Sequence, residues 1–285
     1  MTILMINNLK TIDQTGIKAL IKKRIEHPEK YVDKPLIIWR SLYNDGIMDR
    51  MLEEAFDEYN ANMSKESRKG YRVSILPDEV QISYDFTTPE IIRTDVEGDA
   101  YGKYNFGMLV IDPIFAFMRP KDDTLDIHYS AISSRKVGDI ELLPNVPVVA
   151  FMCYNNDELE NPEQYSDAEQ YLFQPDFDEW AEWALKTGGF PHQFIDFIRG
   201  DGEKEGIIYR WYNYFNTTHE GFRAGCQNPE YWNEIRIELI LEMKKGKIDS
   251  IAGLSEEQFK EACECTSNIS DDVKDAFCKY IVEHK

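Results

Sequence analysis

The chain has 285 residues with 52 acidic and 32 basic side chains, so its formal net charge is −20. That sign disfavours adhesion to nucleic acid or to an anionic membrane surface. Hydrophobic residues make up 42% and aromatic residues 13% of the chain. This composition excludes a disordered protein and suffices for one large domain or two closely packed ones.

Three elements are predicted before residue 60. Thr11 to Ile25 has the pattern of a short basic helix that ends ahead of Pro28, and Leu36 to Trp39 has the pattern of a short buried strand. From Asn44 to Tyr59 the apolar residues have the spacing of one helical face, with Asn44 placed to cap the helix. The apolar face consists of Met48, Met51, Leu52, Ala55, Phe56 and Tyr59.

A period of two replaces the helical period after residue 70. Tyr71, Val73 and Ile75 alternate with polar neighbours. Pro77-Asp78 supplies a turn, and the alternation resumes from Val80 to Phe86, which predicts a β-hairpin with one solvated face. Further strands are predicted at 106–111, at 125–131 and at 146–154, where continuous apolarity favours a central position.

The chain after the last predicted strand is acidic and then helical. Short helices are predicted at Asp176–Leu185 and Phe190–Ile198, while 206–215 is too aromatic to assign to helix or strand. Asn228-Pro229 combines an N-cap with proline at the first helical position and opens a helix that reaches Lys245. Two more helices are predicted to begin at Ser255, where Ser-Glu-Glu-Gln has the capping-box pattern, and at Ser270.

These elements predict an α+β fold. A mainly antiparallel sheet over about 71–154 is expected to follow an N-terminal helix and to precede a helical C-terminal part. The expected domains are an α/β part containing the antiparallel sheet, residues 1–154, and an acidic, mainly helical part, residues 155–285. The alternative is one intimate domain.

No motif for a cofactor or a metal stands out. The glycines at 98–107 and 200–202 lack both the phosphate-loop ending and the dinucleotide pattern. Cys263 and Cys265 lie in a predicted helix, where residues two apart diverge, so buried thiols are favoured over a zinc site. Five cysteines without the spacing of a disulfide framework suit a reducing cytoplasm. We therefore expect no cofactor, no metal and a cytoplasmic location, or a virion if the protein is viral.

The catalytic candidates are weak. Asp126, His128 and Ser130 share one face of a predicted strand, but neighbours on that face are roughly 7 Å apart, and catalytic triads are usually assembled from separate elements. We assign no catalytic residue. If the protein is an enzyme, the residues to test are Asp126, His128, His192 and Asp201.

The binding candidates come from charge and aromatic content. Residues 151–205 hold 14 acidic and 3 basic side chains, interleaved with aromatic ones, whereas residues 1–72 hold 13 basic and 11 acidic. Glutamates four residues apart form a ladder on the helix that begins near Asn228. Docking on a cationic partner and a solvated face over an aromatic core are both open readings of these patterns. The candidates for partner contact are Trp180, Trp183, Glu234, Glu238 and Glu242.

The sequence thus favours a non-catalytic structural or assembly protein. It would dock through an acidic, aromatic-rich surface into a homo-oligomer or a larger complex, for example a virion, against a basic contact surface and without direct nucleic-acid or membrane binding. One alternative is a hydrolase-type enzyme with an Asp/His site on loops of the sheet. A more distant alternative is an acidic mimic of nucleic acid, which the basic balance of residues 1–72 disfavours.

Overall fold

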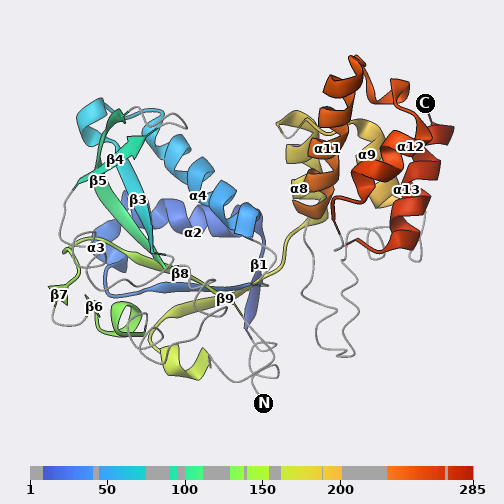
Figure 1. The fold of residues 1–285 in the computed structure, drawn as a ribbon. Helices are drawn as coiled ribbons and strands as arrows, with labels where there is room; N and C mark the ends of the chain where they lie inside the picture. The colour runs from blue at the N-terminus through green and yellow to red at the C-terminus, as the bar shows by residue number, and fades with distance from the viewer. Residues whose placement is uncertain are drawn as a thin grey trace. The chain divides into compact units, whose positions relative to one another are not determined.

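The computed structural model describes residues 9–40, 45–74, 90–94, 100–111, 129–137, 140–153, 162–187, 189–200, 230–266 and 269–284. The chain divides into two compact units, Met1–Gln174 and Pro175–Lys285. Figure 1 shows a sheet with helices in the first unit and helices alone among the labelled elements of the second. In the described parts of the chain, no helix is both long and apolar enough to cross a membrane.

The first unit is built on a parallel sheet. Each neighbouring pair along a path of six strands is parallel. A seventh strand, β4 (Glu90–Thr94), pairs antiparallel with β5 outside this path. A separate antiparallel ribbon joins β6 (Lys136–Val137) to β7 (Ile140–Glu141). In order across the sheet, the six strands are β1 (Lys10–Ile12), β9 (Glu169–Phe173), β2 (Leu36–Arg40), β8 (Val148–Cys153), β5 (Ala100–Ile111) and β3 (Lys69–Ser74).

The expected α+β fold with a mainly antiparallel sheet is therefore wrong, and the fold is α/β. Tyr71 and Val73 belong to β3, which pairs parallel with β5. A period of two reports the surroundings of the two faces of a strand and says nothing of the direction of its neighbour. The other expected arm, residues 80–86, lies outside the described residues.

The expected limits of the sheet are corrected as well. The sheet extends beyond 71–154 at both ends of the sequence, because β1, β2 and β9 belong to it. Residues 129–131, expected as the end of the strand at 125–131, belong to a helical turn at 129–133 that buries Ala131 and Ile132. Ser130 therefore does not lie on a strand beside the other two candidates of the expected triad.

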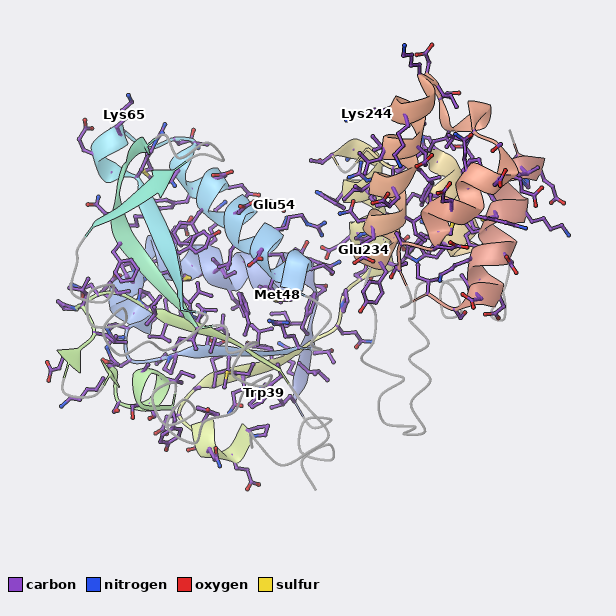
Figure 2. The ribbon with its side chains drawn as sticks, in the orientation of Figure 1. Trp39, Met48, Glu54, Lys65, Glu234 and Lys244 are labelled. Carbon is purple, nitrogen blue, oxygen red and sulfur yellow. The ribbon has the colours of Figure 1, made fainter. Side chains whose placement is uncertain are left out.

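Helices α2 (Gln14–Glu26) and α4 (Asp45–Asn60) cover one face of the sheet. Asp13 begins α2 by accepting a hydrogen bond from the Gly16 N–H at 2.8 Å, and α4 covers the span predicted from its apolar spacing. Both helices bury their apolar residues against Leu36 and Ile38 of β2. Figure 2 shows Met48 of α4 on this side of the sheet.

A second core lies on the opposite face. Ile37 and Trp39 of β2 bury there with the helical turn at 129–133 and with Tyr165 of η2 (Pro162–Tyr165). Trp39 donates its indole N–H to the Gln170 side-chain oxygen at 2.9 Å. Successive residues of β2 thus serve two cores, which confirms the short buried strand predicted at 36–39. Two short elements, α3 (Pro28–Tyr31) and η1 (Lys65–Ser67), complete the described part of this unit.

The second unit is helical and has an aromatic core. Rings of Phe194, Phe197, Trp232 and Phe277 meet with centroids 4.7–5.9 Å apart, mostly edge to face. The helices predicted from residues 176, 190, 228, 255 and 270 are confirmed, with shifts of a few residues at their ends. They are α8 (Phe177–Lys186), α9 (His192–Arg199), α11 (Glu230–Gly246), α12 (Glu256–Cys263) and α13 (Asp271–Glu283), with the short η4 (Ile251–Gly253) between α11 and α12.

Candidate functional site

The sheet has a topological switch point between β2 and β8. After β2 the chain leads to α4, which packs on the face covered by α2. After β8 it leads to η2, whose Tyr165 packs on the opposite face. The two strands are parallel neighbours, with Arg40 opposite Cys153 at their last paired position. Where adjacent parallel strands send the chain to opposite faces, a crevice opens at their carboxyl ends, and ligands of open α/β sheets bind in such crevices.

Arg40 supplies positive charge at this edge. It is the last residue of β2 and is fully buried. Leu36 and Ile38 face the core beneath α2 and α4, so the alternation of the strand directs Arg40 to the same face. An arginine keeps its charge at every physiological pH, and a buried charge is screened much less by solvent than an exposed one.

The N-terminus of α4 adds to this potential. The helix starts at Asp45, and only four residues separate it from the end of β2. Ile47 and Met48 of its first turn share a core with Ile38. Its N-terminal end therefore lies toward the carboxyl edge of the sheet, where the first N–H groups of a helix present partial positive charge. The intervening residues, 41–44, contain no glycine. An anion here would be attracted by Arg40 and the helix end, without a glycine-rich phosphate loop.

The described residues place none of the sequence-based candidates at this edge of the sheet. Asp126, His128 and Asp201 fall outside the described residues. His192 is the first residue of α9 and is exposed. Trp180 is buried in the core of the second unit, and Trp183 is half-buried with its ring 6.4 Å from that of Phe190. Sequence reasoning missed Arg40, although a charged residue that ends a fully apolar run marks the end of a central strand.

The glutamate ladder is unevenly exposed. Glu234 of α11 is exposed and Glu238 is half-buried, whereas Glu242 is only 9% exposed and forms an ion pair with Lys245. Proximity to Glu242, and beyond it to Glu261 and Glu238, raises the pKa of the Lys245 ammonium.

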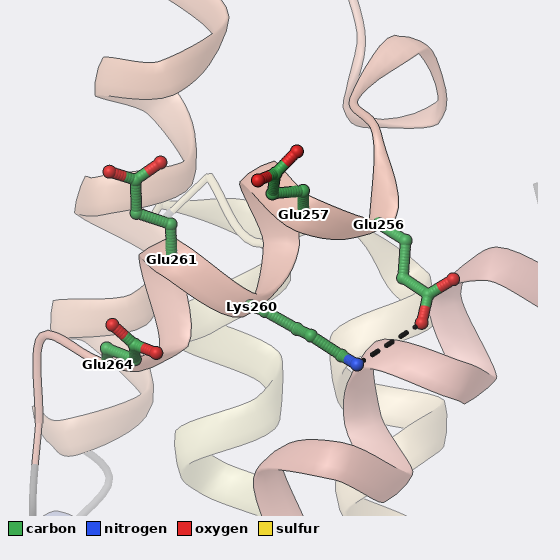
Figure 3. A pocket seen from close by; sticks show the side chains of 5 residues that line it. All are labelled: Glu256, Glu257, Lys260, Glu261 and Glu264. Carbon is green, nitrogen blue, oxygen red and sulfur yellow. Dashed lines mark ion pairs between the residues drawn. The ribbon is translucent and has the colours of Figure 1, made fainter.

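The neighbouring helix α12 carries a hollow of about 650 Å³ on its acidic side. Figure 3 shows its lining residues, among which Lys260 pairs with Glu256 at 3.4 Å. In the described part of the chain, no group of three or more His, Cys, Asp or Glu side chains is arranged to hold a metal ion. The lining residues are Glu256, Glu257, Lys260, Glu261 and Glu264.

A second cavity, of about 320 Å³, lies at the opposite, amino edge of the sheet in the first unit. Arg135 lines it and holds the surrounding loops together by donating hydrogen bonds to the backbone carbonyls of Val32, Leu143 and Val146 at 2.8–3.0 Å. Burial lowers the pKa of this guanidinium, against the opposing effect of Asp33. All three of these hydrogen bonds end on loop carbonyls, which indicates that Arg135 stabilises the loops.

No family model matches the chain, and no curated protein matches it. The solved structures that match include ORC2 of Aeropyrum pernix in ADPNP–ADP complexes, with 12% identity, a TM-score of 0.45, and coverage of 90% of this chain and 68% of that one. The Escherichia coli MS115-1 HORMA:CdnC:Trip13 complex matches with 10% identity, a TM-score of 0.35, and coverage of 93% and 87%. NtrX of Brucella abortus in complex with ATP matches with 11% identity, a TM-score of 0.31, and coverage of 95% and 69%. At these TM-scores the strand order remains the firmer description of the fold.

The expectation of a non-catalytic structural or virion protein is corrected by the architecture of the chain. The expectation treated residues 151–205 as one acidic surface. The structure divides that segment, because β9 belongs to the sheet of the first unit while α8 and α9 belong to the second unit.

Proposed function

We propose that this chain binds a nucleotide at the carboxyl edge of its parallel sheet, between β2 and β8. The observation that carries the proposal is the strand order β9-β2-β8, in which the chain leaves β2 and β8 toward opposite faces. In open α/β sheets, ligands such as nucleotides bind outside the carboxyl ends of two strands related in this way.

The charge distribution at this edge favours a phosphate-bearing ligand over a neutral one. Arg40 and the N-terminus of α4 both contribute positive potential there, although the whole chain carries −20. Because Arg40 is fully buried, we assign it an effect through its field and not a direct contact with the ligand. A unit charge about 8 Å from a phosphate contributes on the order of 2 kcal/mol at an effective dielectric constant of about 20.

The test is ATP binding to the full chain, measured by isothermal titration calorimetry. We expect a dissociation constant below about 1 mM for the unchanged protein and a loss of about thirtyfold in affinity for Arg40→Met. Arg40→Lys keeps the charge and is expected to retain most of the affinity.

A matched control is Arg24 of α2, which lies near the amino end of β2, whereas Arg40 lies at its carboxyl end. Arg24 is also fully buried, and it pairs with Glu169, which lies opposite Leu36 at the start of β2. Arg24→Met should leave ATP affinity unchanged, with circular dichroism verifying that each variant is folded. Equal losses of ATP affinity in Arg24→Met and Arg40→Met would refute a binding site at the carboxyl edge. If inorganic phosphate binds as tightly as ATP, the ligand is not a nucleotide.

A further inference from the structure

Two cysteines meet in the core of the second unit. Cys263 ends α12 and Cys278 lies in α13, and their Sγ atoms are 3.7 Å apart. Both side chains are buried, with residue exposures of 2% and 1%. The sequence predicted buried thiols at Cys263 and Cys265, which is confirmed for Cys263 and wrong for Cys265, an exposed residue. Cys278 lies 15 positions after Cys263, and the contact between them comes from the packing of α12 on α13.

The contact makes the two thiols chemically unequal. The hydrogen bond shared with Cys263 lowers the pKa of the Cys278 thiol, although burial opposes that shift. The same hydrogen bond, together with burial, raises the pKa of Cys263. Cys278 is therefore the sulfur that ionises first, and Cys263 lies beside it as the second thiol of the pair. A thiolate is the nucleophilic and oxidisable form of cysteine.

We propose that Cys263 and Cys278 are a redox pair that peroxide converts to a disulfide, which ties α12 to α13. The Cys278 thiolate attacks one oxygen of hydrogen peroxide, the O–O bond breaks, and the departing hydroxide takes up a proton to become water. This leaves a sulfenic acid on Cys278. The Cys263 sulfur then attacks the Cys278 sulfur, the S–O bond breaks, and the hydroxyl leaves as a second water with the Cys263 proton. Overall, two thiols are oxidised and one peroxide is reduced to two waters.

The geometry requires only local movement. A disulfide bond is about 2.05 Å long, so the two sulfur atoms must approach each other by less than 2 Å. Hydrogen peroxide is about the size of water and needs far less opening of the core than a bulky disulfide reagent. The sulfur atoms already lie in contact, because they share a hydrogen bond.

A nearby cysteine provides an internal control. Cys265 is exposed, but partial burial and the charges of Glu234 and Glu238 raise its pKa to about 11. At neutral pH it is therefore almost entirely a thiol, which is a poor nucleophile. The pair should react in preference to Cys265, although Cys265 is the more accessible of the three.

The experiment treats the folded full chain with hydrogen peroxide at neutral pH, blocks the remaining thiols and maps cross-linked peptides by mass spectrometry. We expect one peptide pair joined through Cys263 and Cys278, lighter by two hydrogens and reversed by dithiothreitol. Cys265→Ser should preserve this product, and Cys263→Ser or Cys278→Ser should abolish it. A disulfide that uses Cys265 instead, or faster formation of the 263–278 link in urea than in the folded protein, would overturn the proposal.

Thermal melting gives a second readout. The bond closes a loop of about 15 residues and so restricts the unfolded chain, which should raise the melting temperature of the second unit by about 5–10 °C. The rise should be present in peroxide-treated Cys265→Ser and absent in peroxide-treated Cys278→Ser. If the disulfide forms without raising the melting temperature, it strains the native packing of α12 on α13. That result would overturn the proposal that the two cysteines are a redox pair.

Discussion

Buried arginines in the first unit illustrate how single residues fix the fold. Arg24 is fully buried, yet its guanidinium donates to the Glu169 carboxylate at 2.6 Å and to the Leu20 carbonyl at 3.2 Å. It also lies over the Tyr31 ring, 4.6 Å from the centroid. These contacts join α2 to β9, two elements almost 150 residues apart. A buried charge is tolerated only where such partners compensate its desolvation.

The Arg24–Glu169 pair predicts a pH dependence of stability. Burial raises the pKa of Glu169, but hydrogen bonds from Arg24 and Tyr171, with the charges of Arg24 and Lys23, outweigh it and lower the pKa overall. A lowered folded pKa means that the stabilisation is complete above the unfolded pKa, near 4.3, and is lost as the pH falls through the folded pKa. Because Glu169 is 36% exposed, solvent screens part of this effect.

Glu169→Gln is therefore expected to lower the free energy of unfolding by about 1–2 kcal/mol at pH 7, as measured by urea denaturation. The difference from the unchanged protein should shrink as the pH falls below 4. Glu141→Gln is the matched control, because Glu141 is 79% exposed and lies 3.7 Å from Lys136, so its loss should change little at either pH. A constant difference between Glu169→Gln and the unchanged protein across this range would contradict the assignment.

At the scale of elements, helix starts show how a local sequence pattern contributes to the free energy of unfolding. Ser255 accepts a hydrogen bond from the Gln258 N–H at 3.2 Å, and the Gln258 side chain accepts one from the Ser255 N–H at 2.9 Å. This reciprocal capping box is the one that the sequence predicted. Ser270 also stands at a helix start, before α13, but its side chain makes no capping hydrogen bond.

The two serines make a matched pair of variants. Ser255→Ala should lower the free energy of unfolding of the second unit by about 1 kcal/mol, because the Gln258 N–H at the start of α12 loses its acceptor, the Ser255 hydroxyl. Ser270→Ala removes the same hydroxyl from an uncapped position and should cost a few tenths of a kcal/mol or nothing. Chemical denaturation followed by far-ultraviolet circular dichroism compares them. Equal costs would show that the hydroxyl of Ser255 is not acting as a cap.

Element type could be predicted from the sequence, whereas strand pairing could not. The span of α4 follows from apolar residues three and four apart, and the burial of β2 follows from its unbroken apolar run, because both signals lie within one element. That β2 pairs with β8 and β9 depends on residues more than 100 positions away. The candidate site escaped prediction for the same reason, since Arg40 gains significance only from the strand beside it.

At the scale of the whole molecule, the division at residue 174 predicts two parts that fold separately. Each unit has a core of its own, aliphatic around the sheet and aromatic among the helices. Expressed alone, residues 175–285 should give a helical circular dichroism spectrum and unfold cooperatively in urea, and residues 1–174 should do the same with a mixed spectrum. The spectra of the two pieces should add up to that of the full chain. A piece that unfolds without a cooperative transition would show that the units depend on each other.

The position of β9 sets the order in which the first unit can be completed during synthesis. β9 is the last strand to be made, yet it lies between β1 and β2 and pairs with both, joining Lys10 to Tyr171 and Leu36 to Glu169. Until residue 173 has emerged from the ribosome, β1 lacks β9 as its neighbour. The edge of β2 that β9 covers in the finished sheet stays open during this time. Contacts between residues so far apart in sequence form slowly, because the chain loses the entropy of loop closure before the contacts stabilise it. The nascent chain therefore carries an open strand edge through most of the translation of the first unit, and that interval is when it depends most on protection from aggregation.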